Sequence, residues 1–383
     1  MDSILIVAGE NSGEKYGADL VRQFKKLHPS HTFFGIGGKH MEREGVRVLF
    51  PVEELAVVGV FEIISRLPRI KKIFNKIKRE IKHQQPRAAV LIDSPDFNLR
   101  LAKKLKKRSI PILYYISPTV WAWRKGRLKT IKKTVDKMML IFPFEERIYE
   151  DYGIPAVYVG HPLKDRVRAS LTKKEFLERY GLDPQKRLIS VLPGSRRSEI
   201  TYHIPVLIKA LERIKSEWNT QFVLLQAESL EENFLLNLIP SGVKGLKIIG
   251  EDHYEAIASS DLVLSACGTA NLEAAFLETP LISFYRISPL TYFFGHRLAT
   301  IKNFSIVNIL AGERIIPELI QRDFTAQNIF EETKKIIDSE EQRSGMIAQF
   351  RKIKKTLGDR TASQNAALEL TKLIKQEQET KKR

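Results

Sequence analysis

The chain has 383 residues, 43% hydrophobic and 28% charged, a composition typical of a folded globular protein and unlike that of a disordered one. Its length favours two domains over one hydrophobic core. The single cysteine, Cys267, excludes an internal disulfide and a cysteine-based zinc site, and it fits a reducing compartment such as the cytoplasm. The formal net charge of +18 indicates an anionic partner: nucleic acid, a phosphate ligand or acidic lipid.

Hydropathy predicts neither a membrane span nor a secretory signal. The sequence has no apolar run of about 18 residues, and residues 4–7 are too few and lack a preceding basic region. Zinc-finger spacing and an RNA-recognition signature are also missing, so nucleic acid is supported by charge alone. We therefore expect a protein that can touch a membrane surface without crossing it.

The first half of the chain alternates short apolar runs with helical patterns. The first apolar run ends at Gly9, and a helical pattern over residues 15–27 follows it. This alternation predicts a parallel sheet covered by helices. The predicted strands lie at residues 4–8, 32–36, 88–92, 112–116, 137–142 and 157–159.

The same alternation restarts near residue 185. Predicted strands follow at residues 188–192, 222–226, 246–249, 262–265 and 281–285, after a connecting segment at 164–186 and before a polar helical stretch at 324–375. We predict an N-terminal domain over 1–185 and a C-terminal domain over 186–383, whose last helices either stay with it or pack back on the first domain or a partner. The predicted fold class is α/β, with two Rossmann-like domains facing across a ligand-binding cleft.

Residues 55–77 form a basic amphipathic segment in which apolar residues are interleaved with arginines and lysines. Such a segment can associate with an anionic membrane. Ordinary helices, with the apolar stripe in the core and the lysines in water, explain the pattern equally well. Pro68 argues against one unbroken helix across the segment.

The first predicted strand runs into a glycine turn that opens a helix. Gly9 and Gly13, with Ser12 between them, allow a ligand close to the backbone, and the helix N-terminus favours an anion. The spacing differs from the dinucleotide fingerprint. Glu10 follows the carboxyl end of the strand and is expected to point toward the cleft. The alternative is a turn whose glycines serve packing alone.

Asp93 follows the carboxyl end of the predicted strand at 88–92, and Pro95 stiffens the loop after it. Asp93 is therefore a candidate general base, which would take a proton from an acceptor hydroxyl. Asp96 and Asn98 belong to the same loop. The alternative is that Asp93 or Asp96 caps the next helix.

Residues 117–124 place Trp121 and Trp123 beside Arg124 after another predicted strand. Indoles often flank sugar sites, and an arginine there can meet a phosphate. Taken alone, however, the motif is typical of packing.

Two turns in the second half are predicted to bind phosphate. Backbone N–H groups near Gly194 and Ser195, with the fork of Arg196, can hold a diphosphate without a metal. A basic surface turn is the alternative there. Gly268, Thr269 and Ala270 open a second helix.

The N-terminus of that second helix suits phosphate, and Glu273, one turn further along, can accept hydrogen bonds from a ribose diol. Cys267 precedes the helix. It has no evident partner base, so we expect it to pack and not to act as a nucleophile.

Together, these motifs resemble the lipid-A-disaccharide synthase family, glycosyltransferases with a GT-B-like fold. The resemblance covers most of the chain. The motifs that carry it are Ala8-Gly9-Glu10-x-Ser12-Gly13, Glu54-Leu55-Ala56-Val57-x-Gly59, Ile92-Asp93-x-Pro95-Asp96-Phe97-Asn98, Ser117-Pro118-x-Val120-Trp121-Ala122-Trp123-Arg124, Pro143-Phe144-Glu145, Gly160-His161, Leu192-Pro193-Gly194-Ser195-Arg196, Gly268-Thr269-Ala270-x-Leu272-Glu273 and Asn308-x-Leu310-Ala311-Gly312.

The resemblance implies an inverting transfer from UDP-2,3-diacylglucosamine to 2,3-diacylglucosamine 1-phosphate, giving a β-1,6-linked disaccharide and UDP. It implies no metal and no cofactor. The implied partners are the two acylated substrates and the anionic cytoplasmic face of the inner membrane, without nucleic acid; a homodimer is left open.

The resemblance also implies roles for residues. Asp93 is the base with Glu10 beside it, and the first half holds the acceptor through the loops of Gly9, Ser12, Gly13, Asp96 and Asn98. The second half holds UDP. Its implied residues are Gly194, Ser195, Arg196, Gly268, Thr269, Ala270, Glu273, Tyr285, Arg286, Asn308 and Gln321. Two positions depart from the family pattern: Glu14 stands where aspartate is more usual, and Cys267 where serine is.

Other interpretations stay open beside this one. They are a transferase acting on undecaprenyl-linked sugars, a nucleotide-sugar epimerase of the same architecture, and a non-enzymatic basic protein that binds nucleic acid or membrane. Release of UDP from UDP-diacylglucosamine separates the first two from the function that the family implies. Protection by UDP against thermal unfolding separates an enzyme from a non-enzymatic protein.

Overall fold

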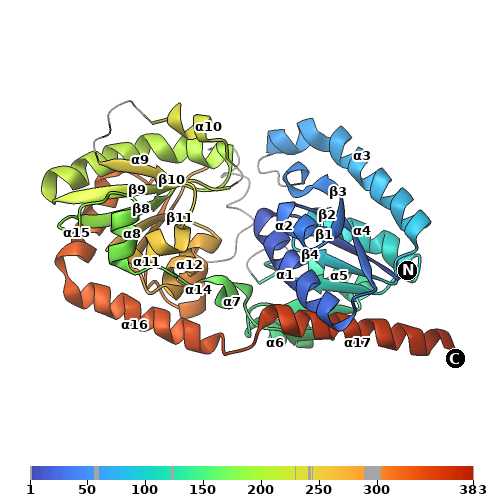
Figure 1. Cartoon of the computed structure of the whole chain (residues 1–383). Coiled ribbons are helices and arrows are strands. Elements are labelled where there is room, and N and C mark those ends of the chain that lie inside the picture. Colours follow the sequence, from blue (N-terminus) through green and yellow to red (C-terminus); the bar gives the residue numbers. More distant parts are fainter. Residues whose placement is uncertain are drawn as a thin grey trace. The chain divides into compact units, whose positions relative to one another are not determined.

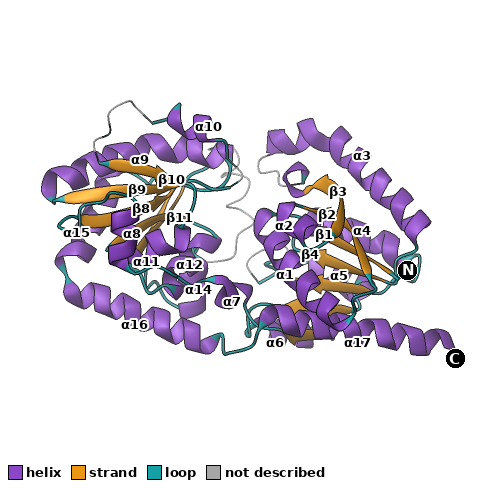
Figure 2. Ribbon diagram, viewed as in Figure 1, coloured by secondary structure: helices purple, strands orange, loops and turns teal. Residues whose placement is uncertain are grey.

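The computed structural model describes residues 2–55, 60–121, 125–228, 230–239, 243, 245–288 and 303–382, without the side chains of 60–67, 232, 233, 378 and 380–382. Contacts divide the chain into two compact units. The first comprises the described parts of Met1–Asp165 and Leu357–Arg383, and the second those of Arg166–Arg297 and Ile301–Thr356. Each unit is a sheet with helices on both faces (Figures 1 and 2), which confirms the predicted α/β class.

The first unit contains a seven-stranded parallel sheet in the order β3-β2-β1-β4-β5-β6-β7. All residues of the central strands β1 and β4 are buried, as expected for strands covered on both faces. The strands are β1 (Ser3–Ala8), β2 (Thr32–Gly37), β3 (Val46–Pro51), β4 (Ala88–Ile92), β5 (Ile112–Tyr115), β6 (Lys137–Leu140) and β7 (Ala156–Tyr158).

Two helical layers cover this sheet. One hydrophobic cluster joins α3, α4 and α5 to one face, while α1 contacts α17 and the strands β1 and β4. The helices are α1 (Asn11–Leu27), α2 (Lys39–Arg43), α3 (Val60–Gln84), α4 (Pro95–Lys106), α5 (Arg127–Thr134), α6 (Glu145–Asp151), α7 (Pro162–Arg166) and α17 (Ala362–Lys382), with a 3-10 turn at Val52–Glu54.

The helix α3 continues through Pro68, contrary to the predicted break. One proline removes one backbone hydrogen bond, and the later turns compensate because Ile73, Ile77 and Ile81 are buried in the core. From residue 68 to 77 the apolar stripe therefore packs inward. Residues 56–59 and the side chains of 60–67, which belong to the predicted membrane segment, lie outside the described residues. Among the described helices, none is long and apolar enough to cross a membrane.

The C-terminal helix α17 packs on the first unit, although the rest of the C-terminal third belongs to the second. Tyr158 donates a hydrogen bond to the Leu357 carbonyl at 2.5 Å, and Asn365 donates to the Val159 carbonyl at 2.9 Å. An ion pair joins Lys137 of β6 to Glu369 of α17. These contacts hold the returning chain against β6 and β7.

The second unit contains a six-stranded parallel sheet in the order β10-β9-β8-β11-β12-β13. Its strands are β8 (Arg187–Leu192), β9 (Thr220–Leu225), β10 (Leu246–Ile249), β11 (Leu262–Ala266), β12 (Leu281–Tyr285) and β13 (Glu318–Ile320). Its helices are α8 (Lys173–Arg179), α9 (Arg197–Glu217), α10 (Glu232–Leu236), α11 (His253–Ser259), α12 (Thr269–Phe276), α14 (Ile306–Ala311), α15 (Ala326–Asp338) and α16 (Glu340–Thr356). All the predicted strands are present. The strands β3 and β13 were not predicted.

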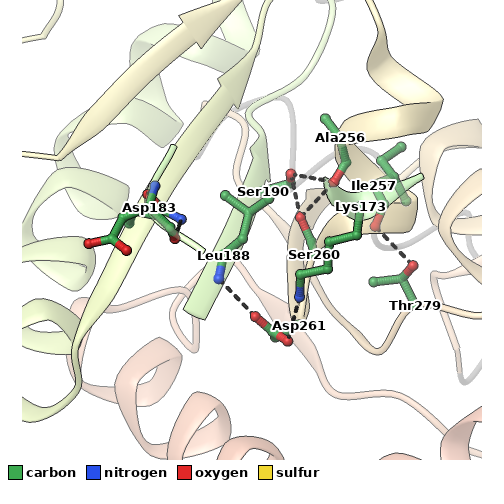
Figure 3. A network of polar contacts seen from close by, with 10 residues as sticks. Lys173, Asp183, Leu188, Ser190, Ala256, Ile257, Ser260, Asp261 and Thr279 are labelled. Atoms are coloured by element: carbon green, nitrogen blue, oxygen red, sulfur yellow. Dashed lines mark hydrogen bonds and ion pairs between the residues drawn. The ribbon is translucent and has the colours of Figure 1, made fainter. Parts of the chain in front are cut away.

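The segment that carries α8 packs on the second unit. Figure 3 shows Asp261 accepting hydrogen bonds from the Leu188 backbone N–H at 2.8 Å and from Lys173 at 3.1 Å. Ser170 also contacts Glu255 through its hydroxyl at 2.8 Å. Because of these contacts, the boundary between the units lies at Asp165, earlier than the residue 185 expected from the sequence.

Both sheets have the strand order of a Rossmann fold, and the order reverses between β1 and β4 and again between β8 and β11. Ligands of such sheets bind outside the carboxyl ends of the strands at this reversal. The turns after these four strands are therefore where each unit's functional residues are expected.

Candidate functional site

The turns after β1 and β4 are in direct contact. These strands pair in parallel, with Ala8 opposite Ile92, so Gly9 and Asp93 leave the sheet side by side. A Cβ atom on Gly9 would lie 1.9 Å from the Cβ of Ser94. Only glycine fits there, and this contact holds the turns of Glu10 and Asp93 together.

Asp93 lies in an unusual backbone conformation. Its φ is +50° and that of Ser94 is +42°, both in the left-handed region that non-glycine residues seldom occupy. The Asp93 carbonyl accepts hydrogen bonds from Asn98 at 2.8 Å and from Tyr114 at 2.6 Å. The surrounding structure thus holds a strained turn, an arrangement frequent at functional sites, and the half-buried Asp93 side chain lies at its tip.

Asn98 and Asp96 play different parts in this loop. Asn98 is buried and donates to the carbonyls of Ile92 and Asp93, so its hydrogen bonds fix the backbone of the loop. Asp96 is exposed, lies in the first turn of α4 and pairs with Arg127 at 2.9 Å. Ser94 occupies the N-cap position of α4, so neither aspartate does.

The other predicted residues of the first unit lie at the start of α1. Glu10 is the N-cap residue and is half-buried, as is Ser12 in the first turn. Gly13 is buried against Ile92. The family-divergent Glu14 is also buried, and it accepts a 2.8 Å hydrogen bond from the backbone N–H of Met41. The longer glutamate therefore reaches the start of α2.

A buried carboxyl lies after β6, next to the tryptophan motif. Glu145 accepts a hydrogen bond from the Trp121 indole at 3.2 Å, and burial raises the pKa of Glu145 to about 7 although hydrogen bonds oppose the shift. Ser117 and Tyr149 form a 2.7 Å hydrogen bond beside it. Glu145 was not predicted as a site residue, although it belongs to a motif that carries the resemblance. Trp123 and Arg124 lie outside the described residues.

The turn after β8 presents Arg196 in a fixed orientation. Gly194 has a φ of +118°, and a Cβ there would lie 2.9 Å from an Oε of Glu199. Buried Glu199 pairs with Arg196 at 2.8 Å and accepts a 2.9 Å hydrogen bond from the Tyr285 hydroxyl. Burial raises the pKa of Tyr285, so this hydroxyl keeps its proton. Ser195 is exposed at the tip of the turn.

A buried histidine joins this turn to the end of β12. The Nδ1 atom of His203 lies 2.7 Å from the Pro193 carbonyl, and Nε2 accepts a 2.9 Å hydrogen bond from the Arg286 backbone N–H. The proton therefore sits on Nδ1. Burial lowers the pKa of His203, which keeps the ring neutral. Neither His203 nor Glu199 was predicted as a site residue; their spacing of four residues on one face of α9 was the available signal.

The turn after β11 is open at the start of α12. Gly268 and Thr269 are exposed, Ala270 is half-buried, and no atom lies within 4 Å of the Cβ position on Gly268. No side chain caps this helix, and the Asn271 N–H donates to the Gly268 carbonyl at 3.2 Å. Burial raises the pKa of Cys267 to about 12, so its thiol stays protonated, as expected of a packing residue.

Glu273 follows on the same helix. It is half-buried and accepts a 3.4 Å hydrogen bond from the Tyr254 hydroxyl. Burial raises the pKa of Tyr254, so this hydroxyl remains a donor. A tyrosine on α11 thus orients the carboxylate predicted to bind ribose.

Three predicted UDP-side residues bind other parts of their own unit. Buried Asn308 donates to the Ile316 carbonyl and to Glu318, and accepts from the N–H groups of Ile315 and Ile316, which uses both donors and both acceptor positions. Its side chain shapes a loop.

Arg286 and Gln321 hold each other's loops in the same way. The Arg286 guanidinium donates to the Gln321 carbonyl at 2.9 Å and lies over the Phe324 ring. Oriented to satisfy both of its groups, the Gln321 amide pairs with the backbone N–H and carbonyl of Ile287. Within the described part of the chain, no three His, Cys, Asp or Glu side chains are placed to hold a metal ion.

The family model of lipid-A-disaccharide synthetase matches residues 4–371. The chain belongs to this family. The lipid-A-disaccharide synthase of Geobacter sulfurreducens is 39% identical over 369 residues, which is 95% of each chain. That of Syntrophus aciditrophicus is 40% identical over 375 residues, covering 97% of this chain and 98% of the relative. The resemblance drawn from the motifs is thereby confirmed.

Solved structures show the fold of this lipid-A-disaccharide synthase family member more broadly. A UDP-GlcNAc 2-epimerase from Neisseria meningitidis has a TM-score of 0.66 at 12% identity, covering 97% of this chain and all of that one. A UDP-bound transferase from Siraitia grosvenorii has a TM-score of 0.60 at 11% identity, covering 99% and 100%. Epimerases and transferases share this architecture, so the fold alone does not separate them.

Family membership makes that separation. It identifies the chain as a glycosyltransferase of lipid A biosynthesis with a UDP-sugar donor, as the motifs predicted. The epimerase and the non-enzymatic basic protein, both left open by the residues alone, are thereby disfavoured.

Proposed function

We propose that this chain condenses UDP-2,3-diacylglucosamine with 2,3-diacylglucosamine 1-phosphate, giving the β-1,6-linked disaccharide 1-phosphate and UDP. The observation that carries the proposal is the Asp93 turn: a strained carboxylate-bearing turn packed against the Glu10 turn at the reversal point of the first sheet. A rigid carboxylate at this position suits a general base.

On the acceptor side, Asp93 takes the proton of the acceptor 6-hydroxyl as the oxygen attacks the anomeric carbon, and Glu10 on the adjoining turn supports it. The attack occurs opposite the leaving UDP, so the anomeric configuration inverts. Gly9, Ser12 and Gly13 bring the backbone close to the acceptor, whereas Asn98 acts by holding the Asp93 carbonyl in place.

On the donor side, the backbone N–H groups at Gly194 and Ser195, the oriented Arg196 and the start of α12 hold the diphosphate. They stabilise the negative charge that UDP gains as it leaves. Glu273 accepts hydrogen bonds from the ribose hydroxyls. Tyr285, Arg286, Asn308 and Gln321 are positioning residues, because their side chains bind neighbouring groups of the protein.

Both proposed substrates carry acyl chains, so we further propose that the enzyme works at the cytoplasmic surface of the inner membrane. Its partners there are the acylated substrates and anionic lipid, and nucleic acid is not among them. The proposed association is peripheral, and among the described helices none can span the bilayer.

The decisive experiment uses both defined acylated substrates, with mass spectrometry of the lipid product and measurement of released UDP. Asp93→Asn keeps the shape of the side chain and tolerates a positive φ, so it removes the base without disturbing the turn. We expect turnover to fall by at least about 100-fold with unchanged thermal stability. Asp151→Asn, at an exposed aspartate at the end of α6, is the matched control and should retain activity. Wild-type turnover in Asp93→Asn would remove Asp93 from the role of base.

A further inference from the structure

The net charge of the chain is concentrated in one stretch. Residues 66–137 contain 22 of the 63 lysines and arginines but only 4 of the 45 aspartates and glutamates. The remainder of the sequence holds 41 residues of each sign. The stretch therefore carries a formal charge of +18, as large as that of the whole chain.

Most of this charge lies on three helices that cover the same face of the first sheet. The cluster that joins α3, α4 and α5 uses Leu5, Val7 and Leu91 from the strands. Helix α1 instead approaches Ile6 and Ile92, where Gly17 meets both. Because alternate strand residues point to opposite faces, α3, α4 and α5 lie opposite α1. Their outward sides form what we call the cationic face.

A hollow of about 290 Å³ opens on this face between α3 and α4. Its lining consists of Lys78, Ile81, Lys104, Lys107 and Arg108. All four cations are exposed, and none forms an ion pair with any carboxylate that the structure describes. Four positive side chains thus surround an apolar floor without a compensating charge.

The carboxylates near this face are already occupied. Glu80 pairs with Arg47 at 2.8 Å, Asp136 with Lys106 at 2.6 Å and Asp96 with Arg127 at 2.9 Å. Each of them neutralises one cation and leaves the hollow untouched. An external anionic surface is the remaining partner for the unpaired side chains.

We propose that the cationic face docks the protein on an anionic phospholipid bilayer, with lipid phosphates seated in the hollow. Long lysine and arginine stems can reach phosphates while their methylenes cover Ile81. Over the described side chains of α3 the contact is electrostatic, because Ile73, Ile77 and Ile81 are buried in the core. Docking brings the enzyme to its acylated substrates, and in this respect the inference rests on the proposed function.

Lipid suits this face better than nucleic acid does. Proteins that bind single strands stack bases on exposed aromatic rings, and the large exposed hydrophobic residues described lie elsewhere. They are Leu27, Phe144, Tyr152, Tyr202, Leu236 and Leu368. The face also borders the acceptor loops, since α4 begins at Pro95, two residues after Asp93. Only the start of α4 borders these loops, because the hollow lies at the other end of this helix, around Lys104, Lys107 and Arg108.

The test is flotation of the full chain with vesicles of phosphatidylcholine, either alone or mixed three to one with phosphatidylglycerol. The hollow variant combines Lys78→Gln, Lys104→Gln, Lys107→Gln and Arg108→Gln. The matched control removes the same charge from exposed lysines on other helices. It combines Lys26→Gln, Lys209→Gln, Lys352→Gln and Lys355→Gln.

We expect binding to the anionic vesicles alone, weakened by salt, and at least about 10-fold weaker in the hollow variant. The control should stay within about two-fold of the wild type. Equal losses in both variants, no loss in the hollow variant, or equal binding to pure phosphatidylcholine would overturn the proposal. The proposal would also be overturned if a mixed-sequence oligonucleotide displaced the protein from the vesicles and if binding of that oligonucleotide depended on the same four residues.

Two further measurements separate this proposal from the proposed function. Asp93→Asn should bind vesicles like the wild type, because docking does not need the base. The hollow variant should release UDP at the wild-type rate from detergent-dispersed substrates. If the wild type binds anionic vesicles as expected but makes no disaccharide, the proposed function fails and the docking face stands. If it makes the disaccharide but does not bind the vesicles, the docking face fails and the proposed function stands.

Discussion

The contact of Gly9 with the Asp93 loop gives a quantitative prediction. In Gly9→Ala the new methyl group would lie 1.9 Å from the Cβ of Ser94, far inside van der Waals contact. The two turns must separate by more than an ångström. Such overpacking costs about 1–3 kcal/mol, and a displacement of about 1 Å at a reacting group can cost about 100-fold in rate. We therefore expect turnover to fall by about 100-fold and the melting temperature by about 2–12 °C.

The assay compares Gly9→Ala with Gly250→Ala by steady-state kinetics and thermal unfolding. Gly250 has no atom within 4 Å of its Cβ position, so alanine there should change neither turnover nor stability. If Gly9→Ala keeps wild-type turnover and melts with the wild type, the Glu10 and Asp93 turns do not depend on their contact. The proposed arrangement of the acceptor side would then be refuted.

Three other perturbations have expected outcomes. Glu199→Gln frees Arg196 and should raise the KM for the UDP-sugar by about 10–100-fold, while Glu231→Gln, which loosens the exposed pair with Arg197, should not change it. Gly268→Ala places its methyl group in open space and at an extended φ of 168°, so unchanged unfolding with a raised donor KM is expected; an unchanged KM would argue against a phosphate there. The pKa of Glu145 is raised from 4.5 to about 7 by burial, so its contribution to stability is complete below pH 4.5 and is lost as pH rises to about 7. Relative to Glu145→Gln, the wild type should lose up to about 3 kcal/mol across this window in urea unfolding, and a constant difference would contradict the buried carboxyl.

Candidate site positions can be predicted from the sequence wherever a buried strand ends in a distinctive turn. Asp93, Gly194 and Gly268 each follow such a strand, and strands buried on both faces leave continuous apolar runs. The edge strands β3 and β13 leave no such run: β3 is only partly buried and β13 has three residues, one of them Glu318. Their pairing partners stabilise them, and pairing is not visible in a local pattern.

The supporting residues were missed for a related reason. Glu199 binds Tyr285, 86 residues away, and His203 binds the backbone of Arg286, 83 residues away. In the sequence both look like ordinary polar positions on α9. Asn308 shows the same limit: its family motif predicts a ligand contact, and the four hydrogen bonds by which its side chain closes a loop are not visible in the sequence. Only the fold brings such partners together.

The return of α17 to the first unit affects how the chain is made. Residues 1–165 are translated first. The contacts that Tyr158, Val159 and Lys137 make with the segment from Leu357 to Glu369 can form only after that segment has been made. The second unit has all of its strands, and its helices through α16, before that moment. The unit encoded first is therefore the last to be completed, and a ribosome that stalls after α16 leaves it with one flank uncovered.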